Sequence, residues 1–159
     1  MKKCMLDMKV TDNCRLHHNY CLLKLTADLP LPDMNPGQFV QVRVPNSATT
    51  FLRRPISVNF VDKQTNELWL LIQLVGDGTR KLAEAKIGDL INIVLPLGNG
   101  FSLPNPGESK KLLLIGGGVG TAPMLYLGAR LKEMGYEPTF LLGARSKNCL
   151  LYTSDAADE

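Results

Sequence analysis

The stretch KLLLIGGGVGTAPMLYL, residues 111–127, is the one around which the predicted fold is organised. Its apolar residues 112–115 predict a short buried strand, and the glycine-rich run 116–120 predicts a sharp turn before an apolar helix that begins near Thr121. Glycine can take positive φ angles, and free N–H groups at a helix N-terminus favour a phosphate. The stretch therefore suits a dinucleotide, although similar glycine turns also occur only so that a helix can pack closely on a sheet.

Composition is that of an ordinary globular protein, with 45% hydrophobic and 21% charged residues among 159. The net charge is +3, and no basic run exceeds two residues, so we expect no nucleic-acid partner. The longest apolar runs, such as 68–72, fall far short of the roughly 20 residues of a membrane span. The apolar run 4–6 is too short for the hydrophobic region of a secretory signal, so we expect none there. We expect a cytoplasmic protein that does not associate with membranes.

Cysteine and histidine spacing predicts neither disulfides nor a metal site. The four cysteines form no CxxC pair, and the adjacent His17 and His18 have no acidic or thiol partner at ligand spacing. We therefore expect free thiols and a surface loop at the two histidines.

Strand and turn signals upstream of the glycine run predict an antiparallel barrel. Short strands are expected at 5–10, 20–26, 39–44, 56–61, 68–74 and 90–95, with one helix at 79–85. Linker-like composition at 104–109 precedes a strand, a helix at 122–134 and a second strand at 139–142. The predicted fold is thus an antiparallel barrel (1–103), a linker (104–109) and the first part of a Rossmann-like parallel α/β nucleotide-binding domain (110–148).

Two stretches of the barrel suggest anion sites. Arg53 and Arg54 enter a strand together, so strand alternation would turn one of them inward, where it needs an anionic partner. Residues 75–80, VGDGTR, end a strand and open a helix at Thr79, whose amides could hold a phosphate. Alternatively, the two arginines are simply the exposed start of a strand, and residues 76–79 are an ordinary capped turn, with no ligand at either place. One flavin dinucleotide would explain both stretches, and a nicotinamide dinucleotide would explain the glycine run.

Four motifs in this order resemble the ferredoxin reductase-like flavoproteins: RPIS at 54–57, GDGT at 76–79, PLGNGF at 96–101 and GGGVGTAP at 116–123. Within them the chain, up to about residue 148, looks most like the electron transfer subunits of NAD-linked dihydroorotate dehydrogenases. The resemblance implies that the barrel binds FAD and that the following domain binds NAD(H).

The resemblance also implies the residues that bind the cofactors. Arg54 would contact the flavin phosphates, and Ser57 would lie near the reactive edge of the isoalloxazine. Ile56 stands where many relatives stack an aromatic ring, so backbone contacts would hold the flavin here. The full predicted set is Arg54, Pro55, Ile56, Ser57, Leu71, Ile72, Gln73, Gly78 and Thr79 for FAD, and Gly116, Gly117, Gly118, Gly120, Thr121 and Pro123 for the nicotinamide side. Arg145 is a further candidate for the pyridine nucleotide, or simply a solvated loop arginine.

The implied function is electron transfer between a pyridine nucleotide and FAD, which needs no side-chain acid or base. In the intact protein, four C-terminal cysteines would hold a [2Fe–2S] cluster. That cluster would exchange electrons with the dihydroorotate dehydrogenase catalytic subunit, which oxidises dihydroorotate to orotate in pyrimidine biosynthesis. Two other functions stay open: a flavin reductase that serves ferredoxin or an oxygenase, and a barrel that only docks a partner.

The last eleven residues, 149–159, do not continue the family pattern. They resemble one reading frame of a transposase sequencing adapter, so we expect the native sequence to depart near Asn148; a genuine acidic tail is the alternative. With two strands of the nucleotide-binding domain, we expect an incomplete nicotinamide site, no bound cluster and an exposed apolar face at 112–115.

Overall fold

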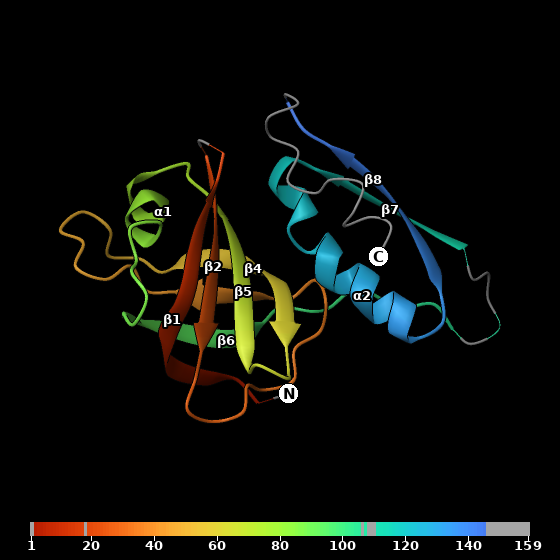
Figure 1. Cartoon of the computed structure of the whole chain (residues 1–159), viewed down its shortest axis with the longest axis horizontal. Helices are drawn as coiled ribbons and strands as arrows, with labels where there is room; N and C mark the ends of the chain where they lie inside the picture. The colour runs from red at the N-terminus through yellow and green to blue at the C-terminus, as the bar shows by residue number, and fades with distance from the viewer. Residues whose placement is uncertain (1, 18, 106, 108–110, 146–159) are drawn as a thin grey trace.

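Six antiparallel strands close into a barrel, which confirms the predicted fold of the N-terminal part (Figure 1). The computed structural model describes residues 2–17, 19–105, 107 and 111–145. The predicted tail at 149–159, with Cys149, and half of the predicted linker (106, 108 and 109) lie outside these residues. Around the barrel the strand order is β1-β2-β5-β4-β3-β6. The strands are β1 (Cys4–Leu16), β2 (Tyr20–Thr26), β3 (Phe39–Val42), β4 (Arg54–Asp62), β5 (Glu67–Gln73) and β6 (Leu90–Leu97).

Strand β1 is twice as long as the sequence suggested. Residues 4–9 pair with β6, and residues 9–16 pair with β2, with a register shift between Val10 and Asp12. The bend lets one strand serve two neighbours, which closes the barrel. The predicted strand at 5–10 missed the second half because residues 11–16 are largely polar and only partly covered.

Alternating apolar side chains fill the barrel. On β5, Leu68, Leu70 and Ile72 are fully buried, and equivalent positions on the other strands complete the core. The helix α1 (Asp77–Leu82) closes one end of the barrel and contributes the buried Leu82 to the same core.

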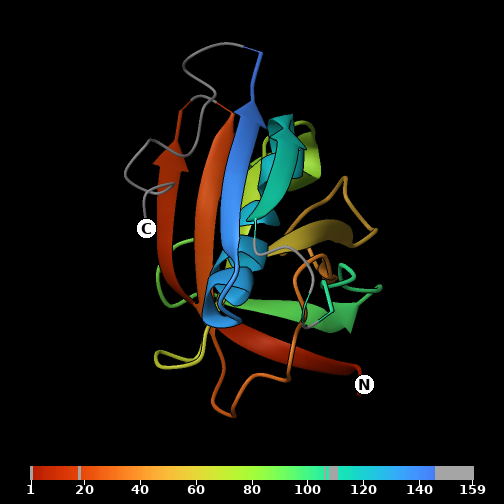
Figure 2. The same cartoon turned by 90° about the vertical axis from the view of Figure 1, so that its right-hand side faces the viewer.

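A small parallel unit follows the barrel and matches the start of a Rossmann-like domain. It consists of β7 (Lys111–Gly117), the 3-10 turn η1 (Gly118–Thr121), α2 (Met124–Glu133) and β8 (Glu137–Gly143). Strands β7 and β8 pair in parallel, with Leu113 opposite Thr139 and Ile115 opposite Leu141. Figure 2 shows the two strands side by side. The helix begins two residues later than predicted, because the backbone first makes the 3-10 turn.

Helix α2 covers one face of this two-stranded sheet. Leu114 faces the helix and is buried, whereas Leu113 and Ile115 on the same strand are 60% and 64% exposed. The expected exposure at 112–115 is thus confined to alternate residues, as the pleat requires. No helix in the described part of the chain is long and apolar enough to cross a membrane.

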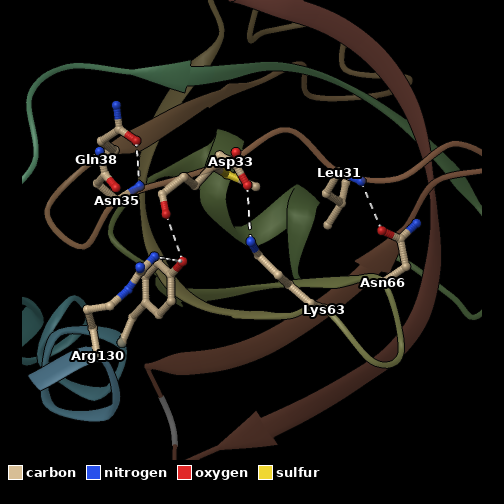
Figure 3. Close-up of polar contacts among 9 residues, drawn as sticks. Leu31, Asp33, Asn35, Gln38, Lys63, Asn66 and Arg130 are labelled. Atoms are coloured by element: carbon tan, nitrogen blue, oxygen red, sulfur yellow. Dashed lines mark hydrogen bonds and ion pairs between the residues drawn. The ribbon is translucent and has the colours of Figure 1, made fainter. Parts of the chain in front are cut away.

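The other side of α2 packs against the barrel. The ring of Tyr126 meets the ring of Phe60 on β4, with centroids 5.8 Å apart, and its hydroxyl donates to the carbonyl of Met34 at 2.7 Å. Figure 3 shows how the loop around Met34 is held: the amide N–H of Leu31 donates to Asn66 Oδ1 at 2.9 Å, and that of Asn35 donates to a glutamine side chain at 2.7 Å. These contacts fix α2 on the barrel.

Candidate functional site

The start of β4 presents alternate residues to the two sides of the barrel wall. Ile56 is 8% exposed and belongs to the core, while Pro55 and Ser57 lie on the outer surface. Pairing with β3 places Ser57 opposite Phe39 and Ile56 opposite Val40. The strand therefore offers its backbone and a hydroxyl to a ligand on the outer surface, with Ile56 as an apolar edge.

The two adjacent arginines have different surroundings. The guanidinium of Arg53 donates to the carbonyl of Asn92 at 3.1 Å and to the carbonyl of Gln41 at 3.3 Å. Both arginines are only half-buried, so the expectation that one of them enters the barrel interior is wrong. Strand alternation does not apply, because β4 begins only at Arg54.

Arg54 is the arginine with spare hydrogen-bonding capacity. Its Nε donates to the carbonyl of Arg53 at 3.2 Å, and it forms no ion pair with any acidic residue in the described chain. Its side chain runs beside Gly78, where a Cβ would lie 3.1 Å from Arg54 Cδ and 3.0 Å from Thr50 Cγ2. A side chain at Gly78 would therefore crowd the arginine, and glycine keeps the approach open.

Thr79 holds the turn that precedes α1. Its hydroxyl oxygen accepts hydrogen bonds from the N–H groups of Val75 and Gly76 at 3.0 and 3.1 Å, and the hydroxyl donates to the carbonyl of Gly76 at 3.0 Å. Gly76, rather than Thr79, is the N-cap residue, so the helix starts earlier than predicted. Thr79 closes the turn from the third helical position, as in a capping box.

The glycine run combines a close contact with an open surface. A Cβ on Gly116 would lie 3.1 Å from the carbonyl oxygen of Gly120, so only glycine lets the turn fold back on β7. Gly118 has a φ of +56°, which glycine adopts without strain. Gly117, Gly118 and Gly120 are exposed. The Thr121 hydroxyl donates to the carbonyl of Gly118 at 2.9 Å and ties the turn together. The strand continues through Gly117, which is later than the sequence suggested.

A groove of about 330 Å³ joins these three regions. One wall comes from β4 and β5 of the barrel, and the opposite wall comes from the glycine turn and the start of α2. Eight of the predicted residues line it: Pro55, Ile56, Ser57, Leu71, Gln73, Thr79, Gly120 and Pro123. Leu71 and Gln73 face the groove, while Ile72 between them is fully buried in the barrel and could reach a ligand only through its backbone.

The other predicted residues do not line this groove. Arg54 and Gly78 lie together beside it at the start of α1. Gly116 and Thr121 are buried within the turn, and Gly117 and Gly118 are exposed on its surface. Arg145 is exposed beyond the end of β8. The structure thus brings the barrel residues and part of the glycine run together.

Comparisons with known proteins agree with this geometry. A protein of Bacillus mycoides named dihydroorotate dehydrogenase B (NAD(+)), electron transfer subunit, is 36% identical over 152 residues, or 96% of this chain and 59% of that protein. The namesake of Desulforamulus reducens is 43% identical over 116 residues, covering 73% of this chain and 44% of that protein. No protein-family model matches.

Solved structures share the fold. The Amycolatopsis cytochrome P450 reductase superposes with a TM-score of 0.80 at 25% identity, over 99% of this chain and 49% of that one. An NADH-dependent reduced ferredoxin-NADP oxidoreductase superposes with a TM-score of 0.80 at 28% identity, over 96% of this chain and 53% of that one. In sequence and in fold, the chain is therefore similar to the ferredoxin reductase-like flavoproteins. It spans between 44% and 59% of the length of the two curated relatives named above.

The groove of this ferredoxin reductase-like chain has no ionisable side chain among its described lining residues. No group of three or more potential metal ligands occurs in the part of the chain that the structure covers. Burial raises the pKa of the Cys21 thiol to about 11, but that thiol lies inside the barrel. The site can therefore orient a bound molecule through apolar surface and through the hydroxyls of Ser57 and Thr79, and none of its described lining residues carries an ionisable side chain to act as a general acid or base.

Sequence reasoning missed three groove residues and one supporting residue. Val75, Val119 and Ala122 line the groove but carry no distinctive side-chain chemistry. The buried Asn59, whose amide Nδ2 donates to the carbonyl of Ala122 at 2.7 Å, joins β4 to the glycine turn. Its neighbours in the sequence gave no signal, because the contact joins residues 63 positions apart.

Proposed function

We propose that this chain binds FAD along the groove and transfers electrons between FAD and a pyridine nucleotide. The observation that carries the proposal is the groove itself, which combines the outer surface of β4 and β5 with an exposed glycine turn and has no ionisable side chain among the described residues that line it. Such a site fits chemistry that belongs to the cofactors, in which the protein supplies binding and orientation.

The residues present fit FAD at two points. Leu71 and Ile56 offer apolar surface to a ring, and Ser57 and Gln73 offer polar groups at its edge. Arg54, which has no acidic partner among the described residues, offers its guanidinium to the pyrophosphate beside the open face of Gly78. The predicted binding set, from Arg54 to Thr79 in the barrel and from Gly116 to Pro123 in the turn, is part of this proposal.

The chemistry is a two-electron exchange. When bound, FAD would supply hydride exchange with a pyridine nucleotide and the capacity to pass electrons on one at a time. The chain's own contribution is to hold the pyridine nucleotide side against the flavin side: β4 and β5 form one wall of the groove and the glycine turn forms the other.

In the cell, we propose that the protein is the electron transfer subunit of an NAD-linked dihydroorotate dehydrogenase. The names of its relatives support this assignment. The intact protein would then carry a [2Fe–2S] cluster and partner a catalytic subunit that oxidises dihydroorotate in pyrimidine biosynthesis. We place it in the cytoplasm, where the free thiols of Cys4, Cys14 and Cys21 are stable.

A second candidate is a flavin reductase that serves ferredoxin or an oxygenase. The similarity to an NADH-dependent reduced ferredoxin-NADP oxidoreductase at 28% identity favours it. Both candidates share FAD and the pyridine nucleotide, so they differ only in the electron acceptor.

The test is to purify the full-length protein encoded by the gene and to measure its flavin content and its reduction by NADH under anaerobic conditions. We expect one FAD per polypeptide, bleached on addition of NADH, and co-purification with a dihydroorotate-oxidising subunit. A well-folded protein that retains no FAD after reconstitution would refute the proposal. Transfer of electrons to ferredoxin, without association with such a subunit, would favour the second candidate.

A further inference from the structure

A β-bulge on β4 turns two consecutive side chains toward the glycine turn. Val58 pairs with Leu70 and Phe60 pairs with Trp69, so Asn59 is an extra residue in β4. Val58 and Val61 point into the barrel core, and Asn59 and Phe60 therefore both face outward. Bulges often occur next to functional sites, where they redirect a side chain.

Both redirected side chains meet the start of α2. Asn59 is 2% exposed, and its Nδ2 donates to the carbonyl of Ala122 at 2.7 Å, directly after the 3-10 turn. The ring of Phe60 packs edge-on against Tyr126, whose hydroxyl donates to the carbonyl of Met34 at 2.7 Å. Two hydrogen bonds therefore hold this segment on the barrel, one at Ala122 just before α2 and one from Tyr126 within α2.

We propose that Asn59 and Tyr126, the two anchor residues, are positioning residues that set the glycine turn against the flavin wall of the groove. Neither residue lines the groove, and each acts through a backbone carbonyl. Because Asn59 lies two positions after Ser57 on the same strand, the strand that presents the proposed flavin site also fixes the proposed nicotinamide site. This inference rests on the proposed function.

The physical reason is the steep dependence of hydride transfer on distance. A displacement of about 1 Å at a reacting pair costs on the order of a hundredfold in rate. Gly117, Gly118 and Gly120 have no side chains to pack on the barrel, and beside the turn the small side chain of Ala122 packs with Tyr20 and Leu71. The anchor residues add directional hydrogen bonds to this packing at the C-terminal end of the turn.

The anchors can be removed with little change in volume. Asn59→Asp keeps the size of the side chain but replaces the donor with an acceptor, and Tyr126→Phe keeps the ring and removes the hydroxyl. Thr26→Val is the matched control, because it removes one side-chain hydrogen bond, from Thr26 Oγ1 to the carbonyl of Asn66 at 2.7 Å, at the other end of the barrel. All three variants are made in the full-length protein.

Two measurements test the proposal. In the flavin-free protein, hydrogen exchange of the amides at 116–123 should accelerate at least about fivefold in both anchor variants and stay unchanged in Thr26→Val. In the FAD-loaded protein, the limiting rate of reduction at saturating NADH should fall about tenfold or more in Asn59→Asp, and less in Tyr126→Phe, with FAD affinity within about threefold of wild type.

Unchanged exchange at the turn in Tyr126→Phe and Asn59→Asp would overturn the inference, and so would an unchanged limiting rate with normal FAD binding. Equal effects in Thr26→Val would show a general loss of stability and would overturn it as well. Failure of the wild-type protein to bind FAD would instead refute the proposed function, and the exchange measurement would still decide whether the anchors hold the turn.

Discussion

Arg53 and Arg54 carry the same charge at adjacent positions, so substituting each in turn separates the proposed phosphate contact from charge alone. The guanidinium of Arg53 is engaged by the carbonyls of Asn92 and Gln41. Arg54 makes only the Nε contact to the carbonyl of Arg53 among the hydrogen bonds of the described residues. We therefore expect Arg54→Ala to weaken FAD binding and Arg53→Ala to leave it nearly unchanged.

The size of the effect follows from the lost hydrogen bonds. A hydrogen bond to a charged group contributes about 1.5–3 kcal/mol, which corresponds to roughly a 10- to 150-fold increase in the dissociation constant for FAD. Arg53→Ala should stay within about twofold of wild type, because charges that do not touch the ligand are screened by salt. Arg53→Ala should instead lower the free energy of unfolding, since it removes the hydrogen bonds from the guanidinium to the carbonyls of Gln41 and Asn92, of which the Asn92 carbonyl keeps the N–H of Arg43 as a donor.

The assay is titration of the flavin-free protein with FAD, followed by the quenching of flavin fluorescence, at low and at high ionic strength. High salt should reduce the difference between the FAD dissociation constants of wild type and Arg54→Ala, because the lost contact is partly electrostatic. Circular dichroism melts of both variants serve as the control for folding. An Arg54→Ala variant that binds FAD as tightly as wild type, or an equal loss in Arg53→Ala, would refute the placement of the phosphate beside Gly78.

Three further predictions concern the packing and titration of the chain. Gly116→Ala would place a Cβ 3.1 Å from a backbone oxygen of the turn and should lower the free energy of unfolding by about 1–3 kcal/mol in urea melts. Gly117→Ala, which has open space around its Cβ, should change that free energy by less than about 0.5 kcal/mol. Gly100→Ala would bring a Cβ to 2.8 Å from that of Asn35 and should cost a similar 1–3 kcal/mol, roughly, by the same measurement; an unchanged urea midpoint would contradict it. Burial raises the pKa of the Cys21 thiol from 9.0 to about 11, so the thiol loses its proton at lower pH in the unfolded chain than in the folded one. The free energy of unfolding should therefore fall as the pH rises from 9.0 to about 11, and Cys21→Ala should reduce this pH dependence.

The order of strands, turns and helices could be predicted from the sequence because it depends on local patterns. Alternating apolar residues in β3 and β5 and the glycine run after β7 have characteristic spacings that neighbouring residues create by themselves. The bend in β1 could not be predicted, because residues 11–16 acquire their strand geometry by pairing with β2. The position of Thr79 was also misjudged, since either end of VGDGT could have capped the helix.

The sequence by itself determined the kinds of residue available to the site: a lone arginine pair, a serine on the same strand, and glycines after a buried strand. The tertiary structure alone decided which of them face one another. It engages the terminal guanidinium nitrogens of Arg53 but leaves those of Arg54 without a partner among the described residues, and it sends Ile72 inward while Leu71 and Gln73 face the groove. It also reveals Asn59 as the link between the two walls, because a bulge depends on the register between β4 and β5, and register is a property of the paired strands rather than of either sequence alone.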